Sequence, residues 1–157
     1  MKIRLDTLTN STHLQWMGNP IRLPIRSCDT SNRLSGPLAT LAPGTGNPRH
    51  VHTLEAECFY VIEGEIDVAY SNETAQLHAD DIVYLPVGLP HQLKSAYKAE
   101  TKLLVLLTQG DIEKAFLSVA GESKENVRLI GNLIHLILPG GILYSRDAGV
   151  SERLPPL

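Results

Sequence analysis

Cysteine is scarce in this sequence, which has only Cys28 and Cys58 among its 157 residues. Two cysteines are too few for a disulfide scaffold or for a zinc site built from thiolates. We therefore expect a protein of a reducing compartment, the cytoplasm. Free cysteines are most often buried as small apolar side chains, so both are predicted to pack against neighbouring residues.

Two classes of partner are excluded by what the chain lacks. Lys and Arg number 14 against 17 Asp and Glu, a formal net charge of −3. Nucleic-acid binding through phosphates needs a basic surface, so no nucleic-acid partner is expected. The best apolar run, residues 133–138, contains a histidine and is far shorter than a membrane helix. Residues 1–6 are too charged for the apolar centre of a signal peptide, and no membrane partner is expected.

Composition and turn residues predict one small β domain. With 43% hydrophobic and 20% charged residues, the chain resembles an ordinary single globular domain. The chain contains twelve Gly and ten Pro, and clusters of turn residues divide its first two thirds into short β-rich segments, as is typical of an antiparallel sandwich or barrel. We expect one domain over residues 1–157, with a barrel over about 14–108. The predicted strands are residues 13–18, 21–27, 37–42, 58–62, 66–70, 82–85 and 103–108.

The apolar pattern changes from β-type to helical spacing near residue 110. One helix is predicted between Asp111 and Gly121, and a second begins after Ser123 and ends before Pro139. We expect these helices, in an extension over about 110–157, to cover one face or end of the β domain. Their apolar stripes consist of Ile112, Ala115, Phe116 and Val119 in the first helix and Val127, Ile130 and Ile134 in the second.

Two histidines, His50 and His52, are separated by a single residue. Side chains alternate along a strand, so both imidazoles would lie on the same face. A lone His-x-His pair is more often an exposed polar strand face than a pair of ligands. The neighbouring residues therefore have to decide between these two interpretations.

Glu57 and His91 would complete a metal site. A bend or bulge within residues 53–56 would turn the Glu57 carboxylate toward the two histidines, and His91 follows a turn at residues 86–88. Alone, Glu57 fits an exposed strand-edge carboxylate and His91 a hydrogen-bonded surface residue. Together, three imidazoles and one carboxylate suit one divalent transition metal (Fe, Mn, Ni, Cu, Co or Zn) rather than Ca or Mg. A six-coordinate ion would keep two positions for water, substrate or O₂.

The spacing of these residues resembles the two motifs of the cupin superfamily. The segments that carry the resemblance are Gly44-x5-His50-x-His52-x4-Glu57-x6-Gly64 and Pro86-x-Gly88-x2-His91. The resemblance implies a mainly β fold, a double-stranded β-helix or jelly-roll barrel, here with one or two C-terminal helices. It also implies that the metal is held inside the barrel. The ligands carried over from the family are His50, His52, Glu57 and His91.

Two positions depart from the family pattern. Asp80 stands where the second motif has a glycine, and Ser95 stands where it has an asparagine. Neither position is a ligand in the family, so the predicted metal site is intact. The two departures leave open whether the turn before Asp81 and one hydrogen bond on the last motif strand are formed as in the family.

The resemblance also implies a homodimer. Small barrels leave sheet edges that need to be covered. Residues 21–25 are a candidate strand for pairing across the two subunits.

A narrower resemblance concerns the activity. Residues 42–52, 57–65 and 85–91 are similar to the quercetin 2,3-dioxygenase-like cupins, within a resemblance over about 14–120. It implies a dioxygenase-like oxidoreductase in which the metal binds a hydroxyl or enolate oxygen of a small organic substrate. Glu57 would take the substrate proton, and Phe59 and Val61 would help to form an apolar pocket. Two other functions stay open: a metal-dependent isomerase, lyase or hydrolase, and a non-enzymatic barrel that only binds a small ligand.

Overall fold

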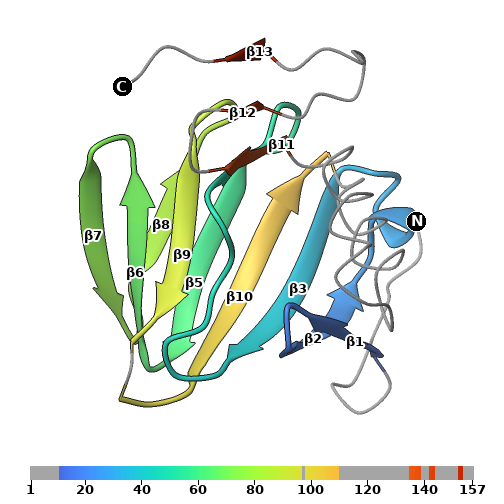
Figure 1. The fold of residues 1–157 in the computed structure, drawn as a ribbon. Helices are drawn as coiled ribbons and strands as arrows, with labels where there is room; N and C mark the ends of the chain where they lie inside the picture. The colour runs from blue at the N-terminus through green and yellow to red at the C-terminus, as the bar shows by residue number, and fades with distance from the viewer. Residues whose placement is uncertain (1–10, 97, 110–134, 139–141, 144–151, 154–157) are drawn as a thin grey trace.

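Two antiparallel sheets make up the described part of the chain (Figure 1). The computed structural model describes residues 11–96, 98–109, 135–138, 142–143 and 152–153. In order across the first sheet, the strands are β1 (Thr12–Trp16), β2 (Asn19–Ile25), β3 (Leu34–Leu41), β10 (Thr101–Thr108), β5 (Glu57–Glu63) and β8 (Ile82–Leu85). In order across the second sheet, they are β13 (Glu152–Arg153), β12 (Ile142–Leu143), β11 (His135–Leu138), β4 (His50–Val51), β9 (His91–Ser95), β6 (Glu65–Tyr70) and β7 (Glu73–His78). A short 3-10 helix, η1 (Ser27–Asp29), connects β2 to β3. The predicted mainly β fold is confirmed.

The apolar core consists of inward-facing side chains of both sheets. Along β5, Phe59 and Val61 are 2% and 0% exposed, whereas Ile62 on the opposite face is 45% exposed. This alternation follows from the two-residue period of a strand, and it recurs along β10 and β6. Full burial of a Val, Leu or Phe side chain stabilises a fold by about 1.5–3 kcal/mol. The buried apolar cluster includes Ile21, Leu23, Leu41, Phe59, Val61, Ile66, Val68, Leu85, Leu93, Leu103 and Leu107.

The predicted strands agree with the observed ones. All seven predicted segments lie on observed strands, and their ends differ by up to three residues. β7 was not among them, because Leu77 is its one buried residue and its other side chains are mostly polar. An edge strand with so few buried positions lacks the hydrophobic alternation by which strands are found in a sequence.

The expectation that residues 21–25 pair across subunits is wrong. These residues lie in β2, which is hydrogen-bonded to β1 along one edge and to β3 along the other. A strand with both edges paired has no backbone edge to offer to a second subunit.

The segment in which two C-terminal helices were predicted is described only in part. Residues 135–138, predicted as the end of the second helix, instead form β11, which pairs with β4. A short apolar run fits a helix and a buried strand equally well, so its period could not decide between them. The first predicted helix and the rest of the second lie outside the described residues. No helix in the described part of the chain is long and apolar enough to cross a membrane.

The two cysteines differ in their environments. Cys28 is exposed in η1, so the prediction that it packs as a buried residue is wrong. The buried residue of this short helix is its neighbour Ser27. Cys58 is half-buried on the outer face of β5, opposite to the face that carries Glu57.

Asp80 and Ser95 are accommodated without loss of the fold. Asp80 has a φ of +73°, a left-handed conformation in which Gly is favoured and Asp is tolerated. Its N–H donates to the carbonyl of Val61 at 2.9 Å, and its Oδ1 accepts the Tyr60 hydroxyl at 2.7 Å. The Ser95 hydroxyl lies 2.9 Å from that of Thr101. Both departures from the motif therefore keep local hydrogen bonds.

Candidate metal centre

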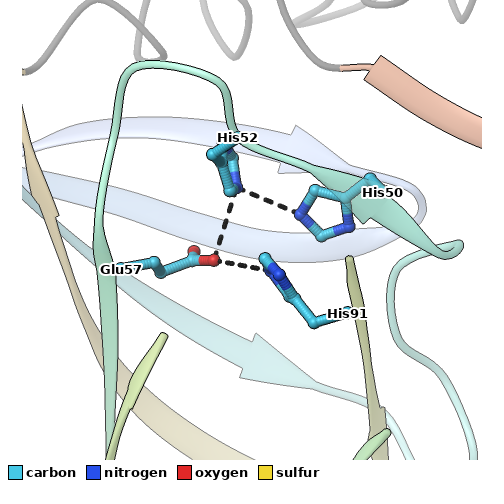
Figure 2. Close-up of side chains that lie close together, drawn as sticks. All are labelled: His50, His52, Glu57 and His91. Carbon is cyan, nitrogen blue, oxygen red and sulfur yellow. Dashed lines mark hydrogen bonds and ion pairs between the residues drawn. The ribbon is translucent and has the colours of Figure 1, made fainter. Parts of the chain in front are cut away.

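The four predicted site residues come from both sheets and meet between them. His50 in β4 lies opposite His91, the first residue of β9, in the pairing of these strands. His52 stands just after β4, and Glu57 is the first residue of β5 in the other sheet. Figure 2 shows the four side chains pointing toward one another. They are 4%, 3%, 6% and 2% exposed for His50, His52, Glu57 and His91 respectively.

The chain crosses from one sheet to the other between His52 and Glu57. Near the end of the crossing, Ala56 N–H donates to Thr108 Oγ1 at 2.9 Å, and Thr108 N–H donates back to the Ala56 carbonyl at 3.0 Å. At its beginning, the His52 carbonyl accepts the N–H of Gly88 at 2.8 Å, which connects it to the turn before β9. This crossing is the predicted bend, and it brings Glu57 to the side of the histidines.

The distances within the cluster fit ligands that share one metal ion. Nε2 of His50 lies 3.1 Å from Nε2 of His52, and Oε2 of Glu57 lies 3.0 Å from Nε2 of His91 and 3.4 Å from that of His52. All four donor atoms lie within 4.8 Å of one another. Metal bonds of about 2.0–2.2 Å place neighbouring ligand atoms about 3 Å apart at right angles and about 3.4 Å apart at the tetrahedral angle. The cluster therefore fits a metal without rearrangement of its elements.

Two of the histidines are oriented by backbone carbonyls. Nδ1–H of His50 donates to the carbonyl of Pro48 at 2.9 Å, and Nδ1–H of His91 donates to that of Leu89 at 2.9 Å. A neutral imidazole protonated at Nδ1 has its lone pair on Nε2. Both Nε2 atoms are therefore in the form that a metal needs.

The electrostatics of the cluster favour the metal-binding protonation states of His50 and Glu57. The pKa of His50 is lowered to about 3, mainly by burial and in addition by the neighbouring His91 and His52. Burial alone would raise the pKa of Glu57, but hydrogen bonds and charge from His52 and His91 hold it well below its usual range. Burial lowers the pKa of His52, but the hydrogen bond and charge of Glu57 outweigh it and raise the pKa. A neutral His50 and an ionised Glu57 are the metal-binding forms.

Glu55 is a buried carboxylate beside the cluster that the sequence patterns did not single out. It is 6% exposed, and its Oε2 lies 3.9 Å from Nδ1 of His52. A glutamate between strands is expected in solvent, so its burial carried no signal in the sequence. The spacing of three residues from His52 was the one available hint.

A mainly apolar cavity reaches the cluster at Glu57. Phe59 also lines it, as predicted, whereas Val61 is fully buried in the core and does not. Its polar lining includes the amides of Asn19 and Asn47, and among the described residues no Lys or Arg lines it. The Oδ1 atom of Asn47 accepts the backbone N–H of Leu93 at 2.7 Å.

The family model of the cupin domain matches residues 37–107. Residues 37–107 are a cupin domain. The matched segment includes all four residues of the cluster, and this donor set provides for one divalent transition metal. The narrower resemblance to quercetin 2,3-dioxygenase-like cupins stays a prediction.

One curated relative shares part of this cupin domain. Over 71 residues the chain is 30% identical to a protein of Streptomyces cyaneus named polyketide synthase CurC. The match covers 45% of this chain and 46% of that protein, so it spans less than half of the relative's length.

Solved structures of other proteins share the fold. A variant of oxalate decarboxylase from Bacillus subtilis superposes with a TM-score of 0.59 at 23% identity, over 68% of this chain and 29% of that one. A predicted oxalate decarboxylase from Thermotoga maritima gives a TM-score of 0.62 at 15% identity, over 67% of this chain and 98% of that one. At these identities the likeness concerns the fold.

Proposed function

We propose that this cupin domain is a metal-dependent oxygenase, in which His50, His52, Glu57 and His91 hold one divalent transition metal. The observation that carries the proposal is that Glu57 belongs both to the metal cluster and to the wall of the apolar cavity. A small organic molecule in this cavity would therefore lie beside the ligand atoms. When bound, a redox-active metal supplies Lewis acidity and electron exchange with O₂.

The protein's own groups have distinct roles in this proposal. His50 and His91 are fixed by backbone carbonyls and serve as rigid ligands. Glu57 accepts the proton of a substrate hydroxyl or enol. Hydrogen bonds from His52 and His91 keep the pKa of Glu57 low, and imidazoles that bind metal through Nε2 no longer donate them. A Glu57 carboxylate released from the metal would then be buried without these donors, and burial would raise its pKa toward the range of a general base.

The cavity favours a neutral substrate with an enol or phenol group. Its wall is mostly apolar, and among its described residues there is no lysine or arginine that could pair with a carboxylate of a small dianion such as oxalate. Because the Asn47 oxygen is engaged by Leu93, its NH₂ group can donate to a substrate oxygen. The relative named polyketide synthase supports this class, because polyketides carry carbonyl groups that enolise.

An oxygen-electrode measurement tests this function. The full chain is loaded in turn with Fe²⁺, Mn²⁺, Co²⁺, Ni²⁺ and Cu²⁺ and mixed with flavonols, enols and 1,3-diketones. We expect O₂ uptake in proportion to substrate consumed with at least one metal. Equal turnover under nitrogen would instead assign an isomerase, lyase or hydrolase. Substrate binding without turnover in either atmosphere would assign a ligand-binding barrel.

We also propose a homodimer. Ile82 and Tyr84 of the edge strand β8 are 64% and 62% exposed, and Ile62 of β5 is 45% exposed. A second copy of the chain would cover these apolar side chains. Light scattering at micromolar concentration should give the mass of two chains, and a monomer mass would contradict the proposal.

A further inference from the structure

One of the three clustered histidines lacks the contact that orients the other two. His50 and His91 each donate Nδ1–H to a backbone carbonyl two residues earlier in the chain. Nδ1 of His52 is buried without a hydrogen-bond partner among the described residues. Metal-binding histidines generally hold the second ring nitrogen with a hydrogen bond. His52 therefore needs an acceptor that the described backbone does not supply.

Glu55 is placed to supply that acceptor. Its Oε2 lies 3.9 Å from Nδ1 of His52, and the two side chains are 7% and 4% exposed. Both residues belong to the segment that crosses between the sheets, so the same backbone positions them. A carboxylate has two oxygens with about four lone-pair sites, so Glu55 can accept a hydrogen bond from the His52 imidazole in addition to its other contacts.

The position of the His52 proton decides whether this contact forms. In the structure, Nε2 of His52 lies 3.1 Å from Nε2 of His50 and 3.4 Å from Oε2 of Glu57, so a proton on Nε2 has acceptors. An Nε2 atom that binds a metal carries no proton, and the neutral ring then carries it on Nδ1, next to Glu55. A hydrogen bond of about 2.9 Å requires a movement of about 1 Å.

We infer that Glu55 is a positioning residue of the metal centre: its carboxylate accepts Nδ1–H of His52 when Nε2 of His52 binds the metal. The contact holds the imidazole in the tautomer and orientation that the metal requires. Outer contacts of this kind contribute about 10–100-fold to metal affinity. The inference rests on the metal centre of the proposed function but not on its reaction.

Metal affinity gives the first test. Co²⁺ is titrated into the metal-free full chain in competition with a coloured chelator, for the wild type and for the Glu55→Ala, Glu55→Gln and Glu63→Gln variants. Glu63→Gln is the matched control, because Glu63 is an exposed carboxylate at the other end of β5. We expect Glu55→Ala to weaken Co²⁺ binding about 10–100-fold. Glu55→Gln, which keeps an acceptor oxygen, should weaken it less, and the control should match the wild type.

Proton NMR of the Co²⁺ protein gives the second test, because bound imidazoles show shifted N–H signals that exchange with solvent. The wild type should show three, from His50, His52 and His91. In Glu55→Ala one should exchange faster or disappear while two remain. If Glu55→Ala does not fold, the Glu55→Gln variant replaces it. Accelerated exchange of one N–H signal in Glu55→Gln would support the inference, and unchanged exchange of all three would contradict it.

The two failures are distinguishable. Wild-type affinity together with three unchanged N–H signals in the Glu55 variants would overturn the role of Glu55 alone. Absence of Co²⁺ binding by the wild type would overturn the metal centre of the proposed function, and the inference with it.

Discussion

The metal cluster and the apolar core both lie between the two sheets, yet burial has opposite effects on the free energy of their side chains. Phe59 and Leu103 of the core are stabilised by leaving water, and they need only apolar neighbours. Glu57, two residues before Phe59 on the same face of β5, is equally buried and is stabilised only by partners for its charge. On β5, the burial of Phe59 thus stabilises the fold, whereas the burial of Glu57 costs stability and serves the metal cluster.

The largest effect is expected at the metal cluster, on the rate of turnover. Glu57→Gln should keep much of the metal, because an amide oxygen can still coordinate and three imidazoles remain. Turnover should fall about 10²–10⁴-fold, because an amide cannot accept the substrate proton. Metal content and turnover are measured on the same sample, once the oxygen-electrode screen has found a substrate. Near-normal turnover per bound metal would remove the base role and leave the ligand role.

Truncation of a core residue should also lower the stability of the fold. Phe59→Ala should lower the free energy of unfolding by about 3–5 kcal/mol, because it leaves a cavity in the core. The matched control is Tyr60→Ala on the outer face of the same strand, where the hydroxyl makes an exposed hydrogen bond to Asp80. A loss under about 1 kcal/mol is expected there. Urea unfolding checks both variants, and equal losses would contradict the inward and outward assignment.

Removal of the metal should have a smaller but diagnostic effect. A ligand present at 100–1,000 times its dissociation constant stabilises the folded state by about 2.7–4.1 kcal/mol. A chelator should therefore lower the thermal midpoint of the metal-loaded wild type. It should leave the His50→Ala/His91→Ala variant unchanged, because that variant retains too few ligands. An equal decrease in both proteins would show that the chelator acts elsewhere.

The sequence predicted the features of the core and of the metal cluster that depend on the spacing of residues along the chain. Alternation along β5 indicated correctly that Glu57, Phe59 and Val61 share a face. The intervals between His50, His52, Glu57 and His91 selected the four residues that the structure brings together.

What the sequence could not predict depends on contacts between distant segments. The bend after His52 was expected, but its crossing into the other sheet depends on the hydrogen bonds of Ala56 with Thr108. The burial of Glu55 follows from that crossing. β7 was missed because its side chains are mostly polar, and β11 because a short apolar run has no distinctive period.

The central claim is that His50, His52, Glu57 and His91 hold one metal ion. Elemental analysis of the purified full chain, incubated with excess divalent metal and desalted, tests it most directly. We predict one equivalent per chain in the wild type and none in the His50→Ala/His91→Ala variant. His78→Ala is the control, since His78 is exposed on β7, and it should retain one equivalent. Full metal retention in the double variant would contradict the assignment.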